Sequence, residues 1–195
     1  MNFINDLSHE DIASRLRFAI RCVLSKDRNL FNFEVNERTV TQRLALYLEN
    51  EFASLNSKLR ADCEYNRMWA ESCEGEINLT KKYPKLKEQL LSIEDTNGVT
   101  VFPDIIVHLR ESKLANVLVI EAKRNSPQKP MPENDRIKLF EFTRENGSFR
   151  YLWGAFLDFR SFQSPCGTAL KVVTLVDIVW FRDGKPFTTE QVQLQ

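Results

Sequence analysis

The apolar positions in the first fifty residues recur every three or four residues, which is the spacing of one face of a helix. The first such stripe follows Ser8 and Asp11, a hydroxyl cap with an acidic side chain three positions later, and it predicts an amphipathic helix over about residues 9–25. A second helix is expected after Asn36, a good capping residue. The two stripes consist of Ile12, Leu16, Ile20 and Val23, and of Val40, Leu44, Leu48 and Phe52.

Beyond the second helix, short runs rich in β-branched residues replace the helical spacing. Ala61–Asn66 alternates between polar and apolar residues and predicts a strand. Val101–Leu109 and Val117–Lys123 are almost continuously apolar, which is typical of strands covered on both faces. The stretch before them is harder to interpret, and Lys85–Glu94 is compatible with a helix.

The last third of the chain predicts one more helix and two more strands. The helix is expected to start at a cap on Asn134 or Asp135 and to close at Gly147, a residue type that commonly ends helices in a left-handed conformation. Tyr151–Phe159 and Lys171–Phe181 have the pattern of strands. The order is helix, helix, strand, strand, strand, helix, strand, strand, so we expect an α/β protein with a central mixed sheet flanked by helices. A chain of 195 residues fits a single domain.

Composition and charge narrow the function classes. The chain has 27 Lys and Arg residues against 27 Asp and Glu residues, which argues against coating nucleic acid by bulk electrostatics but leaves a local basic cleft open. Six glycines and two histidines disfavour glycine-rich phosphate loops and multi-histidine metal sites.

The chain carries no membrane or secretion signal that we recognise. No apolar stretch approaches the roughly 18 residues that span a bilayer, and Met1–Glu10 lacks the apolar run of a signal peptide. The four cysteines show no C-x-x-C spacing, so we expect reduced, mostly buried thiols and a cytoplasmic protein without a membrane partner. They are Cys22, Cys63, Cys73 and Cys166.

Two predicted strands carry charge where more Val or Ile would be expected. Asp104 follows Pro103 in the first, and Glu121 and Lys123 close the second. Alternation along a strand puts Glu121 and Lys123 on one face with Cα atoms about 6.6 Å apart, and Asp104 meets Glu121 if the strands are neighbours. A solvated strand end is the alternative, which the apolar run Val117–Ile120 disfavours. Buried carboxylates cost several kcal/mol unless a partner or a metal compensates them.

Magnesium is the natural compensating ion for such a cluster, because it prefers oxygen ligands and keeps several waters. Asp104, Glu121 and the carbonyl of Ala122 would be ligands, and Lys123 would act on a metal-bound water or on charge developing on a phosphodiester. Glu37 is a further candidate, because it shares a helix face with the second apolar stripe. Two alternatives stay open: Glu37 serves only as a favourable charge at a helix N-terminus, or Glu34 takes its role.

At this point the residues resemble the PD-(D/E)XK nuclease superfamily, whose core runs α-β-β-β-α-β like that of restriction endonucleases. Pro103-Asp104 is similar to its PD element and Glu121-Ala122-Lys123 to its (D/E)XK element. Glu37 is similar to the acidic residue of the preceding helix. Residues 62–67 also resemble the first core strand of a bacterial branch without an assigned function. The resemblance covers about residues 34–160, and the strand near 171–181 is an addition to that core.

The resemblance implies a magnesium-dependent phosphodiesterase, with manganese as a substitute, that acts on DNA ahead of RNA. It implies catalytic roles for Asp104, Glu121, Lys123 and Glu37. Polar residues of the following helix, here Asp135 and Lys138, would contact substrate. Restriction-type relatives are often dimers, so a homodimer is among the expected states. The main alternative is a non-catalytic nucleic-acid- or protein-binding module that keeps the fold.

The two histidines are expected to have no catalytic role. His108 lies four residues beyond Asp104, about 13 Å along the strand, which is too far to share a metal and favours a structural role. His9 lies in a helix cap region. A Ser-His or Cys-His hydrolase is therefore disfavoured.

Overall fold

The structure is a computed structural model that describes residues 7–32, 35–65, 67–72, 75–80, 82–83, 99–100, 102–110, 115–163 and 171–194. Its centre is a six-stranded mixed sheet in the order β1-β6-β7-β8-β9-β10. Neighbouring strands run antiparallel except β7 and β8, which are parallel. The strands are β1 Arg60–Cys63, β6 Ile105–His108, β7 Asn116–Arg124, β8 Trp153–Gln163, β9 Lys171–Arg182 and β10 Lys185–Gln193.

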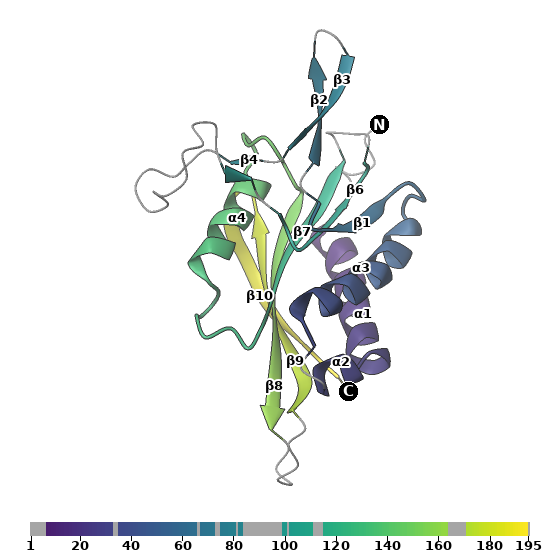
Figure 1. Cartoon of the computed structure of the whole chain (residues 1–195), viewed down its shortest axis with the longest axis vertical. Coiled ribbons are helices and arrows are strands. Elements are labelled where there is room, and N and C mark those ends of the chain that lie inside the picture. Colours follow the sequence, from purple (N-terminus) through teal and green to yellow (C-terminus); the bar gives the residue numbers. More distant parts are fainter. Residues whose placement is uncertain are drawn as a thin grey trace.

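Helices cover both faces of this sheet. Figure 1 shows α1 and α3 on one side and α4 on the other, with α4 joining the parallel strands β7 and β8. The helices are α1 His9–Lys26, α2 Asn29–Asn32, α3 Glu37–Ala53 and α4 Glu133–Thr143. The predicted α/β architecture with a mixed sheet and flanking helices is therefore confirmed.

Each sheet face has its own apolar core, and the two cores fix which way every strand residue points. Leu118, Ile120 and Ala122 of β7 belong to the core under α1 and α3. Val119 belongs to the core under α4, together with Ile106 of β6. Since side chains alternate along a strand, positions 121 and 123 of β7 point to the α4 side.

Two predicted helix starts are confirmed. The side chain of Ser8 accepts a hydrogen bond from the backbone N–H of Asp11, and the Asp11 carboxylate bonds back to Ser8, which completes a capping box. The side chain of Asn36 accepts from the backbone N–H of Arg38 and caps α3. The expected helix over about 9–25 is α1.

The predicted limits of the third helix are wrong at both ends. Helix α4 begins at Glu133 after Pro132, not after Asn134 or Asp135. It ends at Thr143, because Arg144 is extended with ψ 136°, and the N–H of Gly147 donates to the carbonyl of Arg144 in a turn. The N–H of Tyr151, eight residues past Thr143, donates to the carbonyl of Phe142 at 2.9 Å and so satisfies one of the carbonyls that the helix end leaves free.

The sequence analysis missed several strands. Strand β10 pairs with β9 through a tight turn at Asp183 and Gly184, whose φ angles are 50° and 70°. This Asp-Gly turn is a strong hairpin signal that the apolar pattern did not reveal. Two small sheets were missed as well, β2 Arg67–Ser72 with β3 Gly75–Thr80 and β4 Lys82–Tyr83 with β5 Val99–Thr100. The helix considered over 85–94 lies outside the described residues.

Several strand boundaries also differ from the prediction. Strand β8 runs over Trp153–Gln163, two residues later at its start and four residues later at its end than expected. Strand β1 ends at Cys63, because Glu64 has a positive φ of 50° that breaks the extended backbone before residue 66. Strand β6 begins at Ile105, so Asp104 lies in a bend just before the strand.

His108 has the structural role expected for it. Its Nε2 lies 3.0 Å from Oδ2 of Asp62, and Arg110 binds the same carboxylate. Although burial raises the pKa of Asp62, its hydrogen bonds with Arg110 and His108 outweigh this and hold the pKa well below its usual range. This pairing ties β6 to β1.

Two of the four cysteines and all described helices bear on the expected reduced thiols and on the absence of a membrane-spanning segment. Cys22 is a buried free thiol and Cys63 a half-buried one, whereas Cys73 and Cys166 lie outside the described residues. Burial raises the pKa of Cys63 to about 11. Within the ranges that the structure describes, none of the helices is long and apolar enough to cross a membrane.

We predict that Gly154→Ala destabilises the protein by pushing α4 off the sheet. A Cβ atom at Gly154 would lie 2.9 Å from Cγ2 of Thr143 and 3.2 Å from Cδ2 of Leu139. Such overpacking costs about 1–3 kcal/mol, so the melting temperature should fall by roughly 2–12 °C. Thermal unfolding followed by circular dichroism measures it, with Ser148→Ala in an exposed loop as the control. An unchanged melting temperature would contradict the close packing described.

Candidate metal and phosphodiester site

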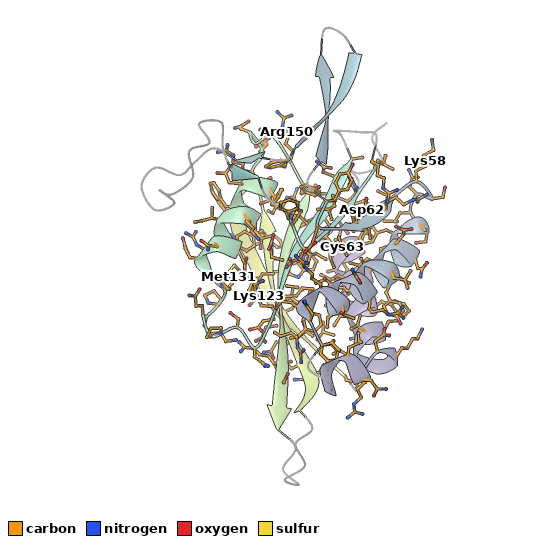
Figure 2. All side chains as sticks on the ribbon, viewed as in Figure 1. Lys58, Asp62, Cys63, Lys123, Met131 and Arg150 are labelled. Carbon is orange, nitrogen blue, oxygen red and sulfur yellow. The ribbon has the colours of Figure 1, made fainter. Side chains whose placement is uncertain are left out.

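The predicted site residues converge at one end of β7, on the side of the sheet that α4 covers. The register pairs Ile105 with Ile120, so Asp104, just before β6, lies opposite Glu121. Lys123 follows two residues later on the same face. It lies near the middle of the molecule, between the α3 and α4 sides (Figure 2).

Asp104 is held against the main chain of β7. Its Oδ2 accepts a hydrogen bond from the backbone N–H of Ala122 at 2.7 Å. Burial raises the pKa of Asp104 despite this hydrogen bond and the positive charges of Lys123 and Lys138. Asp104 is therefore a carboxylate that its surroundings leave short of positive charge.

Glu121 is fully buried, which is rare for a carboxylate. Its Oε2 accepts from Nζ of Lys138 on α4 at 2.8 Å, while its Oε1 has no hydrogen-bond partner among the described residues. Burial first, and the charge of Asp104 second, raise the pKa of Glu121 well above its ordinary value of 4.5. One ammonium thus compensates Glu121 incompletely.

Lys123 is paired with the carboxylate at the start of α3. Its Nζ donates to Oε1 of Glu37 at 3.0 Å, and the backbone N–H of Arg124 donates to Oε2 at 3.1 Å. Burial lowers the pKa of Lys123, but the carboxylates of Asp104 and Glu37 outweigh it and leave the pKa above its ordinary value. Glu37 therefore lies at the site, whereas Glu34 lies outside the described residues.

Helix α4 contributes Lys138 and Asp135, the two residues predicted to contact substrate, to the side of the site that faces the helix. Nζ of Lys138 lies 2.8 Å from Oε2 of Glu121 and 3.7 Å from Oδ1 of Asp135. Asp135 is buried, and its Oδ2 has no partner among the residues described. Lys138 thus makes its closer contact with Glu121 and not within its own helix.

The structure adds a carboxylate that the sequence analysis missed. Asp158 of β8 pairs in register with Lys123 and is fully buried. It accepts from the backbone N–H of Ser126 at 3.0 Å and pairs with Arg160 at 2.9 Å. Burial is the main reason that its pKa is raised. The signal was present, because Asp158 interrupts the apolar run 155–159 as Glu121 interrupts that of β7.

The oxygen ligands that Asp104 and Glu121 offer suit a hard divalent cation, although they are only two carboxylates. Two acidic residues, Asp104 and Glu121, share one face, and the free Oε1 of Glu121 is the kind of oxygen that such a cation binds. The described ranges contain no group of three or more His, Cys, Asp or Glu residues arranged to hold a metal. Since magnesium usually takes one or two carboxylates and keeps waters, two acids are sufficient for it.

Comparisons with known proteins do not place the chain in a family. No family model matches it, and no curated protein sequence matches it. One solved structure, described as "Crystal structure of SSO0001", aligns with 98% of this chain and 73% of its own, at 11% sequence identity and a TM-score of 0.25. A TM-score this low carries no argument about fold or function.

We predict that Glu121→Gln stabilises the metal-free protein at neutral pH. Because the folded-state pKa of Glu121 is raised, the wild type loses stability as the pH rises through that pKa, and the neutral amide avoids this loss. The gain should be about 1 kcal/mol, or 2–4 °C, and should shrink as the pH falls towards and below 4.5, because Glu121 then becomes protonated in the unfolded state as well.

Thermal unfolding in a chelator at several pH values measures this gain. Glu133→Gln is the matched control, because Arg136 lowers the pKa of that exposed carboxylate and its removal should bring no gain. A Glu121→Gln variant less stable than the wild type at neutral pH would contradict the description of Glu121 as under-compensated.

Proposed function

We propose that this protein is a magnesium-dependent nuclease with a restriction-endonuclease-like core, which hydrolyses phosphodiester bonds of DNA ahead of RNA. The elements α3-β1-β6-β7-α4-β8 follow the α-β-β-β-α-β order that the PD-(D/E)XK resemblance implies, with β2 to β5 inserted after β1. Pro103-Asp104 lies directly before β6, and Glu121-Ala122-Lys123 lies in the neighbouring strand β7. The order of elements and the position of both motifs support the proposal together.

The observation that carries the proposal is the state of Glu121. A fully buried carboxylate with one oxygen unpartnered among the described residues, beside the half-buried carboxylate of Asp104, is costly to the fold. Proteins retain such groups most often at functional sites. A divalent cation supplies the missing positive charge.

Asp104 and Glu121 would hold the magnesium ion, with the carbonyl of Ala122 as a further ligand. When bound, the ion lowers the pKa of a coordinated water and stabilises negative charge on the phosphoryl oxygens. Both oxygens of Glu37 are already engaged, by Lys123 and by the N–H of Arg124. Glu37 therefore contributes by holding Lys123 in position, and reaches the metal shell only through water.

Lys123 would act as a cation. Its raised pKa keeps the ammonium protonated at neutral pH, so it orients the attacking water and stabilises charge that develops on the phosphodiester. Lys138 has three N–H donors and uses one for Glu121, so it retains donors for a phosphate oxygen. Asp135 beside it would help to orient Lys138.

A non-catalytic binding module is the second candidate, and one observation favours it. The two ion pairs Glu121–Lys138 and Glu37–Lys123 neutralise much of the cluster within the chain itself. A protein that had lost hydrolysis could keep these pairs to hold α3 and α4 against the sheet.

Cleavage assays distinguish the two candidates. With manganese or magnesium, we expect the wild type to cut plasmid or single-stranded DNA, and Lys123→Ala to lower the rate by about 10²–10⁴-fold. Lys185→Ala, which removes an exposed lysine of β10, is the control and should cut at the wild-type rate. Absence of cleavage on DNA and RNA, or full activity in Lys123→Ala, would contradict the nuclease proposal.

A further inference from the structure

Two consecutive residues in the first turn of α3 reach opposite sides of Asp104. Glu37 binds Nζ of Lys123 on β7 at 3.0 Å. Arg38 binds Oε1 of Glu64, the residue directly after β1, through its Nε at 2.7 Å. The backbone N–H of Glu64 in turn donates to the carbonyl of Asp104 at 3.3 Å. Arg38 therefore lies on the β1 side of the candidate site, and Lys123 lies on its β7 side.

The order of the strands gives the separation of these two sides. Strand β6 lies between β1 and β7, and neighbouring strands are about 4.8 Å apart, so the end of β1 lies roughly 10 Å from β7. Along one strand of duplex DNA, phosphates follow one another at a rise of about 3.4 Å. A DNA strand that crosses the sheet from Lys123 towards β1 therefore brings a phosphate about three positions along it to Arg38.

The cations at the centre of the site already face carboxylates of the site. Lys123 pairs with Glu37, and Lys138 pairs with the fully buried Glu121. Asp104 adds a further negative charge beside Glu121. A second phosphate of the same strand is therefore better neutralised by a cation outside this cluster.

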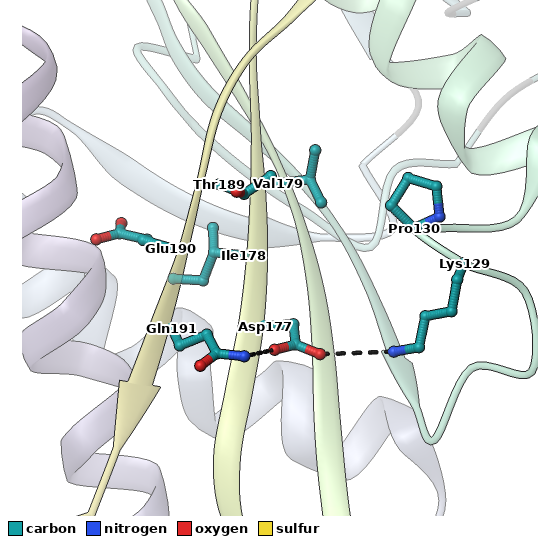
Figure 3. Close-up of a pocket in the computed structure, with 8 residues that line it drawn as sticks. All are labelled: Lys129, Pro130, Asp177, Ile178, Val179, Thr189, Glu190 and Gln191. Atoms are coloured by element: carbon teal, nitrogen blue, oxygen red, sulfur yellow. Dashed lines mark hydrogen bonds and ion pairs between the residues drawn. The ribbon is translucent and has the colours of Figure 1, made fainter.

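On the β8 and β9 side of Lys123, the nearby cations are held by carboxylates with little exposure. Nζ of Lys129 lies 3.3 Å from Asp158 and 3.5 Å from Asp177, at the edge of a cavity of about 290 Å³ (Figure 3). Arg160 pairs with both carboxylates, at 2.9 and 3.0 Å. The Asp158 side chain is 1% exposed and that of Asp177 is 29% exposed. Moving these cations to a phosphate would leave mostly buried carboxylates uncompensated.

The pair of Arg38 and Glu64 does not have this constraint. Their side chains are 70% and 43% exposed, so water solvates Glu64 when the guanidinium moves away. Ion pairs this exposed contribute little to stability, and the helix dipole opposes a cation in the first turn of α3. A phosphate is a stronger partner, because the N–H fork of a guanidinium binds two phosphate oxygens at once.

We propose that Arg38 binds a backbone phosphate of the substrate strand on the β1 side of the bond to be cut, and that Glu64 holds the guanidinium in place until the strand arrives. The phosphate then replaces Glu64 as the partner of Arg38. The inference rests on the proposed nuclease function for its substrate. It adds a residue that sets the affinity for the strand and takes no part in the hydrolytic step.

DNA binding in a chelator tests Arg38 without requiring cleavage. Fluorescence anisotropy of a labelled DNA duplex measures the affinity of the full chain between about 50 and 200 mM salt. We expect Arg38→Ala to weaken binding about tenfold and to reduce the slope of log K against log salt by about one, the value of one phosphate contact. Arg38→Lys should keep the slope and lose less affinity, because an ammonium keeps the charge without the fork.

Glu64→Gln should have the opposite effect. We expect it to tighten DNA binding about two- to fivefold, because the amide neither holds Arg38 as strongly nor repels the strand. A pair that serves only the fold predicts no such gain. Arg21→Ala, which removes an exposed arginine of α1, is the matched control and should bind DNA as the wild type does.

Absence of DNA binding by the wild type, an unchanged salt slope in Arg38→Ala, an equal loss in Arg21→Ala, or no gain in Glu64→Gln would overturn the proposal. The cleavage assay separates it from the nuclease function. There, Arg38→Ala should raise KM about tenfold and leave kcat nearly unchanged. The expected binding effects without any cleavage would remove the nuclease function and leave the phosphate contact standing.

Discussion

The burial of Glu121 in the middle of an apolar strand is the constraint on which the rest of the site depends. A carboxylate without solvent contact needs positive charge, and Lys138 of α4 supplies part of it through a 2.8 Å contact. That contact requires α4 to lie close against the sheet, which the small Gly154 of β8 allows. Asp104, fixed by the N–H of Ala122, then adds a second negative charge beside the first.

The charged groups form a continuous band and not an isolated pair. From Lys123 the band crosses the sheet through Asp158 and Asp177, and Arg160 pairs with both of these carboxylates. Each carboxylate therefore shares its cation with a neighbour, and moving one would leave another under-compensated. This interdependence explains how the α4 face of the sheet holds two buried acids, Glu121 and Asp158, beside an apolar core of its own.

Features that depend on local pattern could be predicted from the sequence. Ser8 and Asn36 act as caps because capping depends on residues within one turn. Asp104, Glu121 and Lys123 were identified because charge interrupts apolar strands there, and the structure brings them together. Asp158 gives the same local signal, because it interrupts the apolar run 155–159 of its strand.

Features that depend on distances between elements could not be predicted. Helix α4 ends at Thr143, and the chain returns so that Tyr151 donates to the carbonyl of Phe142, a long-range contact that no local helix-end signal reveals. The pairing of Lys138 with Glu121 depends on the separation between helix and sheet. Spacing along the chain predicted only that Lys138 lies on the helix face towards the sheet. That Glu37 reaches Lys123 likewise depends on where the start of α3 lies relative to β7, and Glu34 lies outside the described residues.

Manganese-dependent thermal stabilisation tests the central claim, that Asp104 and Glu121 together bind a divalent cation. At about tenfold excess over Kd, binding should add about 1.4 kcal/mol and raise the melting temperature of the wild type by roughly 3–6 °C. Asp104→Asn should abolish this shift. Asp183→Asn, in an exposed turn whose positive φ suits asparagine, should retain it. No shift in the wild type, or an equal shift in Asp104→Asn, would contradict the account.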